Sequence, residues 1–186
     1  MTAQASRPAD APPYPHVRHL APSPWEAEHI RQLTRCQIAD RMVELGALRA
    51  ATSGAGPLEW NRLSRTFLHR LVIDLRRPGF ALLIAENDTT TACAYGYPRS
   101  PGLFEIREMV VPRRVREQFT NRDWNLARRL QRRLLDDHGH ATGLISIDRS
   151  DLRGLRALEA WGWQEPAGPP HGLPSWNPHR VLLLTP

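Results

Sequence analysis

The sequence predicts an α/β fold (α+β with a mixed sheet), in which a single domain has a central mixed β-sheet flanked by helices. Short apolar segments of strand length alternate along the chain with amphipathic segments of helix length. Such an alternation favours a sheet with helices on both faces. The chain has 186 residues, of which 41% are hydrophobic, so it suits one domain with a complete core.

The N-terminal part is predicted to supply a tail, a strand and two helices. Residues 1–15 contain four prolines and little that can pack, which indicates a disordered tail before a domain of residues 16–186. Residues 16–20 have the character of a strand. Apolar residues at helical spacing then predict one helix over Ser23–Ala50. After the Gly-rich break of residues 54–57, a second helix is predicted, with one face formed by Trp60, Leu63, Phe67 and Leu71.

The middle of the chain is predicted to form a hairpin followed by a longer strand and a helix. Residues 80–85 and 91–97 are apolar and lie on either side of a turn-rich pentapeptide. The third strand of this group covers residues 103–111 and leads into a basic loop. The helix after the loop is expected to begin at Thr120 or Asn121, since either side chain can cap it.

The C-terminal part is predicted to add a strand, a short helix and a last strand. Residues 141–147 are apolar enough for an interior strand. Ser150 can cap a helix that Gly162 ends, and residues 181–184 form the final strand. The expected order is therefore strand, two helices, three strands, helix, strand, helix, strand.

Positive charge is concentrated between Arg107 and Arg133. Nine arginines in this stretch are opposed by three acidic residues, so it carries +6, which equals the formal net charge of the whole protein. All 25 basic residues of the chain are arginine, whose planar fork suits phosphates and carboxylates. A strand, a basic loop and a helix N-terminus together favour anion binding. Two interpretations stay open: a solvated helix face, and a surface for a polyphosphate or a nucleic acid.

The composition argues against several kinds of protein. The sequence has no run of eighteen apolar residues and no signal-peptide pattern, so we expect a cytoplasmic protein without a membrane partner. With two cysteines, a disulfide framework and a Cys-rich metal site are excluded. The histidines show no spacing typical of ligands, and no metal site is expected.

Three segments carry a family resemblance: the Ala-Tyr-Gly-Tyr-Pro of residues 94–98, the strand of residues 104–112, and the Glu-Ala-Trp-Gly-Trp of residues 159–163. In this order they resemble the GNAT superfamily of N-acyltransferases, over about residues 16–184. The resemblance implies an enzyme that forms an amide on a small-molecule amine. In typical members, the fourth strand hydrogen-bonds the pantetheine arm of acetyl-CoA, and an Arg-x-x-Gly-x-Gly/Ala loop wraps the pyrophosphate.

The chain departs from the family pattern at that loop and in the last helix. Asp123 and Asn125 occupy the positions that glycine usually holds. A carboxylate there repels phosphates, and both side chains keep them from the backbone N–H groups. The tyrosine that commonly protonates the departing thiolate corresponds to Leu158.

Three functions remain open. An enzyme that takes its acyl group from aminoacyl-tRNA accounts for the missing glycines, the absent thiolate acid and the Arg-rich helix together. Charged tRNA is therefore the favoured donor, and no tightly bound cofactor is expected. An enzyme that uses acetyl-CoA or another acyl-CoA is the alternative, and a non-catalytic GNAT-like binding protein is the second alternative. A homodimer stays open in each case.

Candidate catalytic residues lie on two neighbouring strands. Amide formation needs a group that accepts a proton from the amine, and Glu105 or Glu108 can be this base. Because they lie three residues apart, we expect them to face opposite sides of the sheet, so only one can serve. Tyr97 shares a face with Tyr95 and can present a hydroxyl to the same place.

The residues expected to bind the donor are of three kinds. Backbone groups at a bulge near the end of the central strand would meet the oxyanion. Arginines of the loop and helix would bind phosphates, and an aromatic ring could stack on the 3′ end of an RNA. These residues are Met109, Val110, Val111, Arg113, Arg114, Arg116, Arg122, Trp124, Asn125, Arg128, Arg129, Arg132 and Arg133.

Overall fold

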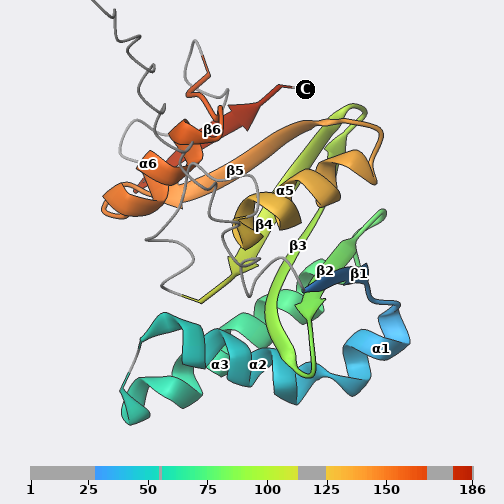
Figure 1. The fold of residues 1–186 in the computed structure, drawn as a ribbon, viewed down its shortest axis with the longest axis vertical. Coiled ribbons are helices and arrows are strands. Elements are labelled where there is room, and N and C mark those ends of the chain that lie inside the picture. The colour runs from blue at the N-terminus through green and yellow to red at the C-terminus, as the bar shows by residue number, and fades with distance from the viewer. Residues whose placement is uncertain (1–27, 55, 113–124, 167–177, 186) are drawn as a thin grey trace, which may run out of the picture.

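A six-stranded β-sheet forms the centre of the protein, with its strands side by side in chain order (Figure 1). The computed structural model describes residues 28–54, 56–112, 125–166 and 178–185, so the tail and first strand predicted within residues 1–20 lie outside it. The strands are β1 (His29–Gln32), β2 (Ala81–Glu86), β3 (Thr90–Ser100), β4 (Leu103–Val110), β5 (Thr142–Asp148) and β6 (His179–Leu184). β4 and β5 run parallel, and every other neighbouring pair is antiparallel.

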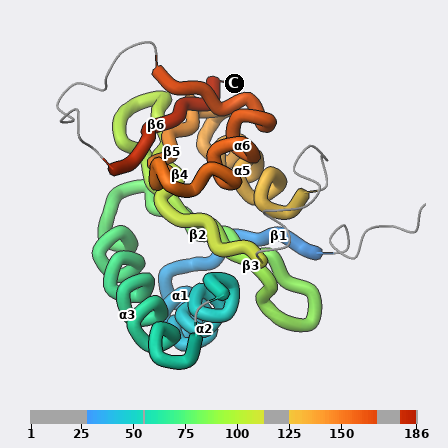
Figure 2. Tube along the Cα trace, turned by 90° about the vertical axis from the view of Figure 1, so that its left-hand side faces the viewer, coloured from blue at the N-terminus to red at the C-terminus, as the bar shows by residue number. Residues whose placement is uncertain are grey.

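Helices cover both faces of this sheet (Figure 2). One layer holds α1 (Arg35–Asp40), α2 (Met42–Ser53) and α3 (Pro57–Asp74), and the opposite layer holds α5 (Leu126–Asp136) and α6 (Leu152–Ala160). The predicted fold class, a mixed sheet flanked by helices, is confirmed.

Each face of the sheet has its own hydrophobic core. The α5-face core includes Phe104, Leu130 and Trp163, whereas the α3-face core includes Leu71 and Tyr95. Successive residues of a strand point to opposite faces, so the apolar strands β2 and β3 contribute to both cores.

The connection between α2 and α3 forms where the sequence predicts a break. Gly54 ends α2 with a φ of 71°, a left-handed conformation that glycine adopts without steric cost, and Pro57 opens α3 at its first turn. Phe67 and Leu71 are buried on the inner face of α3, as expected. Trp60, predicted on the same face, is 37% exposed near the start of the helix.

The predicted helix over Ser23–Ala50 is wrong in its first part. Ile30 lies in β1 and pairs with Ala85 of β2, although its spacing from the later apolar residues is helical. The helix begins after Thr34, whose side chain accepts a hydrogen bond from the Gln37 backbone in a capping box. Pairing with β2 therefore overrides the local periodicity.

Two other helices begin at different residues from those predicted. α5 is capped by Asn125, whereas Thr120 and Asn121 lie outside the described residues. α6 is capped by Asp151, which accepts a hydrogen bond from the Gly154 backbone, instead of by Ser150. In both cases the polar side chain immediately before the first helical residue is the cap, because it is best placed to reach the free N–H groups.

Candidate functional site

The two parallel strands at the centre of the sheet diverge halfway along β4. They pair from Leu103 with Thr142 to Ile106 with Ile145, and no further. β4 continues along β3 and β5 continues along β6. The C-terminal half of β4, residues 107–110, thus has no described strand on its β5 side. Its backbone groups on that edge can pair with an extended ligand.

A β-bulge marks the point of divergence. Ile106 is opposite Gly96 of β3 and Glu108 is opposite Tyr95, so Arg107 is an extra residue without a partner. The bulge was predicted at Met109–Val111, and this position is wrong by two residues. A Cβ on Gly96 would overlap the backbone carbonyl of Glu105, so glycine permits the close approach of β3 to β4 at this point.

The bulge also corrects the predicted orientation of the two candidate bases. Glu105 is opposite Tyr97 and Glu108 is opposite Tyr95, and both tyrosines lie on the α3 face of β3. The glutamates therefore face the same side of the sheet, and the expectation of opposite faces is wrong. The extra residue at 107 shifts the alternation of side chains by one position.

A group of ion pairs lies on the α3 face beside the bulge. Asp74 of α3 lies 3.5 Å from Arg107 Nε and 3.3 Å from Arg77 Nε. Glu105 lies 3.3 Å from Arg107 Nη1 and 3.0 Å from Arg99 Nε. We call these five residues the ionic cluster. Arg107 contacts both carboxylates, so it ties the bulge of β4 to α3.

The structure distinguishes the two candidate bases. Glu105 is buried and is held by two arginines of the ionic cluster. Among the described residues, Glu108 forms an ion pair with Arg49 Nε at 3.2 Å, and its side chain keeps 19% of its surface exposed. Glu108 is thus the carboxylate that an amine can approach from solvent.

The environment of the two tyrosines of β3 favours their neutral form. Burial raises the pKa of Tyr95 and of Tyr97, and the neighbouring glutamates raise both values further. The Arg77 guanidinium lies 4.4 Å from the centre of the Tyr97 ring, a cation–π contact. The Tyr95 hydroxyl is fully buried and has no hydrogen-bond partner among the described residues.

The N-terminus of α5 is occupied by its own cap. Asn125 is buried, and its Oδ1 accepts hydrogen bonds from the backbone N–H groups of Ala127 (3.0 Å) and Arg128 (3.3 Å). These are two of the donors that would otherwise bind a phosphate at a helix N-terminus. The predicted donor-binding residue Asn125 therefore competes with the ligand for the helix end.

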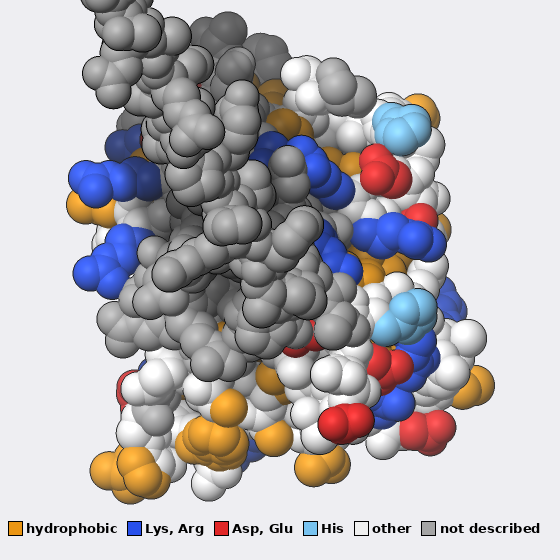
Figure 3. Space-filling model, in the orientation of Figure 1, with side chains coloured by type: hydrophobic (Ala, Val, Ile, Leu, Met, Phe, Trp, Pro, Cys, Tyr) orange, Lys and Arg blue, Asp and Glu red, His pale blue; other side chains and the backbone are white. Residues whose placement is uncertain are grey.

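The predicted phosphate-binding arginines of α5 all have partners within the chain. Arg129 Nη2 donates to the backbone oxygen of Glu28 at 3.0 Å, and Arg133 Nε lies 2.8 Å from Asp137. Arg128 and Arg132 also have interactions. On the right-hand side of Figure 3, basic side chains lie beside carboxylates. The other predicted residues of this group, Arg113, Arg114, Arg116, Arg122 and Trp124, lie outside the described residues.

The side chains of the other predicted donor-binding residues that the structure describes pack in or against the two cores. The side chains of Val110 and Val111 are buried, in the α3-face and α5-face cores respectively. Met109 packs against the α5-face core, and its sulfur lies 3.7 Å from the Gln131 amide nitrogen. Leu158, at the position matched to the thiolate acid, is buried in the α5-face core and has no proton to donate.

Sequence reasoning missed two residues that shape this site. Asp74 lies seven residues after Phe67 and three after Leu71, on the same face of the helix, and a carboxylate on an apolar helix face is a signal that it has a buried partner. Arg49 has no comparable signal, because its pairing with Glu108 depends on how α2 crosses β4.

A pocket of about 460 Å³ lies at the opposite end of β4. Its lining includes Pro78, Pro98, Arg99, Phe104 and His138, but neither glutamate nor the diverging half of β4. It shares Arg99 with the ionic cluster but does not include Glu108 or the open edge of β4. Within the described ranges, no three side chains of the ligand types gather as a metal site. No helix among these residues is long and apolar enough to span a membrane.

Several acetyltransferases are among the solved structures that share this architecture. PaiA N-acetyltransferase from Thermoplasma acidophilum, in complex with coenzyme A, matches with a TM-score of 0.59 and 10% identity, over 85% of this chain and 98% of that chain. The ribosomal-protein-S18-alanine N-acetyltransferase from Escherichia coli matches with 0.55 and 13%, over 84% and 92%. An acetyltransferase of the GNAT family from Staphylococcus aureus matches with 0.55 and 12%, over 84% and 98%.

No protein-family model matches the sequence, and no curated protein matches it either. At identities of 10–13%, the structural matches establish the fold and nothing finer. The chain has the GNAT fold.

Proposed function

We propose that the protein is an N-acyltransferase that transfers an acyl group from an acyl-CoA thioester to an amine. One observation carries this proposal. β4 and β5 diverge after Ile106 and Ile145, and the bulge at Arg107 turns Glu108 to the same face as the ionic cluster. An open strand edge for the donor therefore adjoins a carboxylate for the acceptor.

The open edge suits the donor because of the shape of pantetheine. This arm is extended and contains two amides, so it can pair with residues 107–110 of β4 as an additional strand would. The fold is shared with a structure in complex with coenzyme A, which supports an acyl-CoA over other donors. The partners of the α5 arginines support the same choice, because these cations are engaged within the chain.

Glu108 is the base that accepts a proton from the acceptor amine. An amine is protonated at neutral pH, so its proton must pass to a base, directly or through water, before the nitrogen can attack. The nitrogen then forms a bond to the acyl carbon, the carbon–sulfur bond breaks, and CoA leaves as a thiolate. A backbone N–H of residues 109–110 would stabilise the oxyanion. Because Leu158 has no proton, the thiolate takes its proton from water or from the attacking amine.

Aminoacyl-tRNA is a second candidate donor, and the cap of α5 favours it. The Asn125 side chain holds two N–H groups that a CoA pyrophosphate would need. A donor that leaves as a ribose hydroxyl and binds through many dispersed phosphates does not need this helix end.

Calorimetry with acetyl-CoA tests the donor. We expect binding to the wild type, and tighter binding to Asn125→Gly, which frees the N–H groups while costing only a few tenths of a kcal/mol in helix stability. Asn125→Ala is the matched control, because it removes the same cap but keeps a Cβ near the phosphates. No acetyl-CoA binding, together with transfer from charged tRNA that weakens steeply with salt, would establish the second candidate.

Thiol release from acetyl-CoA in the presence of amines tests the base. Glu108→Gln should lower turnover roughly 10²- to 10⁴-fold while the fold is kept. Glu59→Gln, which loses only an exposed ion pair with Arg62 on α3, is the control and should not change turnover. Normal turnover by Glu108→Gln would exclude this residue as the base. Absence of turnover with any donor, alongside tight binding of a protein partner, would indicate a non-catalytic protein.

A further inference from the structure

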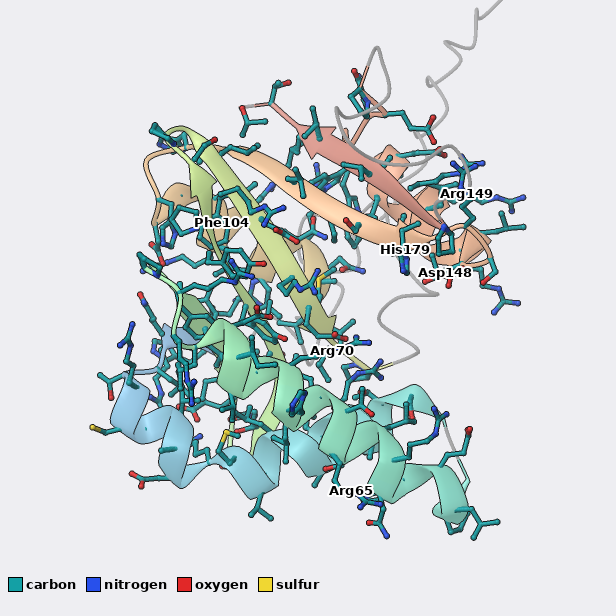
Figure 4. All side chains as sticks on the ribbon, turned by 180° about the vertical axis from the view of Figure 1, so that it is seen from behind. Arg65, Arg70, Phe104, Asp148, Arg149 and His179 are labelled. Atoms are coloured by element: carbon teal, nitrogen blue, oxygen red, sulfur yellow. The ribbon has the colours of Figure 1, made fainter. Side chains whose placement is uncertain are left out.

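Arg70 is an arginine of α3 at the edge of the proposed site. On α3 it lies four residues before Asp74, so both side chains are on the same side of the helix. Asp74 contacts Arg107 at the bulge, and Arg77, in the turn after α3, contacts the Tyr97 ring. Going back along the chain from Arg77 through Asp74 therefore leads toward the C-terminal half of β4. Figure 4 shows Arg70 extending from α3 toward the end of β4.

The described charged residues around Arg70 carry a net positive charge. The ionic cluster contains two carboxylates and three arginines, a net charge of +1. The pair of Glu108 and Arg49 is neutral. Arg70 is exposed and makes no hydrogen bond or ion pair with any other described residue, which raises the total to +2.

The far side of the site does not offset this charge. Asp148 ends β5 and His179 begins β6, and Figure 4 places both, with Arg149, across from Arg70. Asp148 already accepts hydrogen bonds from the backbone N (2.8 Å) and the Oγ (2.6 Å) of Ser150. Asp148 and Arg149 are adjacent in the sequence and opposite in charge, so together they add no net charge.

From this arrangement we infer that the acceptor amine carries a carboxylate, as an α-amino acid does, and that Arg70 binds that carboxylate. The inference rests on the proposed function, because it assigns the acceptor of the same site. A guanidinium binds a carboxylate through a two-pronged contact, which would hold the amine of the same molecule over Glu108. A polyamine or another polycation would instead meet a surplus of positive charge.

The first measurement compares matched acceptors. Thiol release from acetyl-CoA is followed with α-amino acids and with the corresponding amino-acid amides, which keep the amine and lose the negative charge. We expect the wild type to favour the acids by roughly 10- to 100-fold in kcat/KM, the range for a hydrogen bond to a charged group.

The second measurement assigns this preference to Arg70. Arg70→Gln should remove the preference by raising KM for the acid, with the amide and acetyl-CoA constants unchanged. Arg70→Lys should restore part of the preference. Arg65→Gln is the matched control, because Arg65 is on the same helix, points away from the sheet, and donates to the Asn61 carbonyl at 3.3 Å (Figure 4).

Several outcomes would overturn the inference. Amides or polyamines that serve as well as the acids would exclude a carboxylate subsite. A rise in the KM for acetyl-CoA in Arg70→Gln would assign Arg70 to the phosphates of the donor. If no amine releases thiol, ligand-observed NMR of the amino acids decides: binding to the wild type but not to Arg70→Gln supports the subsite, and absence of binding overturns it. Failure of the proposed function would appear separately, as absence of acetyl-CoA binding.

Discussion

The two faces of the central sheet differ in the polarity of the side chains that they bury. The α5-face core is apolar, and two buried amides lie on α5 or at its cap: Gln131 accepts a hydrogen bond from Trp163 Nε1 at 3.1 Å, and Asn125 caps the helix. The α3 face combines a hydrophobic core with the buried carboxylates Asp74 and Glu105 and the buried hydroxyl of Tyr95. Buried polar and charged groups cost stability unless they are paired. We infer that packing on the α5 face contributes most to the free energy of unfolding. The α3 face contributes less, because it holds charged groups beside the diverging strands.

The largest effect should come from the apolar face. Leu130→Ala removes a side chain with no exposed surface, so we expect a loss of about 2–5 kcal/mol in the free energy of unfolding. Urea unfolding measures this loss. Leu58→Ala, at a position that is 96% exposed, is the control and should change stability by less than about 0.5 kcal/mol. A small loss for Leu130→Ala would mean that the α5-face core collapses around the cavity.

The next effect should come from the ionic cluster. Asp74→Asn removes a buried counter-charge from Arg77 and leaves Arg107 with Glu105 alone. Solvent offsets part of the loss, since both arginine side chains are more than 40% exposed. We expect a loss of about 1–3 kcal/mol. A double-mutant cycle with Arg107→Gln measures the coupling. If the effects of the two single substitutions add, the contact between Asp74 and Arg107 contributes nothing to the free energy of unfolding.

A smaller, pH-dependent loss of stability should follow from substitution of Glu86, which forms ion pairs near the β1 edge of the sheet. Hydrogen bonding from Arg31 lowers the pKa of Glu86 below its ordinary value of 4.5, and Arg41 Nη1 adds a contact at 3.0 Å. A lowered folded-state pKa contributes stability that is present above pH 4.5 and is lost as the pH falls through the folded value. Glu86→Gln should therefore lower stability by about 1 kcal/mol at pH 7 and by much less at pH 3. Equal losses of unfolding free energy at pH 7 and pH 3 would show that the charge of Glu86 does not stabilise the fold.

The smallest effect should come from the buried hydroxyl of Tyr95. The hydroxyl has no hydrogen-bond partner among the described residues, so Tyr95→Phe removes an unpaired polar group and keeps the ring. We expect a change between zero and a gain of about 1 kcal/mol in the free energy of unfolding. Thermal unfolding of the two proteins side by side measures it. A loss above about 1 kcal/mol would reveal a partner for the hydroxyl that lies beyond the described residues.

Local sequence determined most of the secondary structure and the class of the fold. The break before α3 follows from Gly54 and Pro57, whose backbone preferences act within a few residues. The apolar segments of β2 to β5 were predicted close to their observed limits, because hydrophobic patterning and turn residues are local signals as well. The order of these elements was sufficient to predict a mixed sheet with helices on both faces.

Only the tertiary structure decided the geometry of the site, because each of its features depends on residues far apart in the sequence. The bulge at Arg107 exists through the pairing of β4 with β3, and it reverses the predicted orientation of Glu108. Asp74 acquires its role from the crossing of α3 over β4. Ile30 has helical spacing and still forms a strand, since β2 offers it a hydrogen-bonded partner. Periodicity describes how one element exposes its faces, whereas pairing between elements decides which residues meet and where a strand edge stays open.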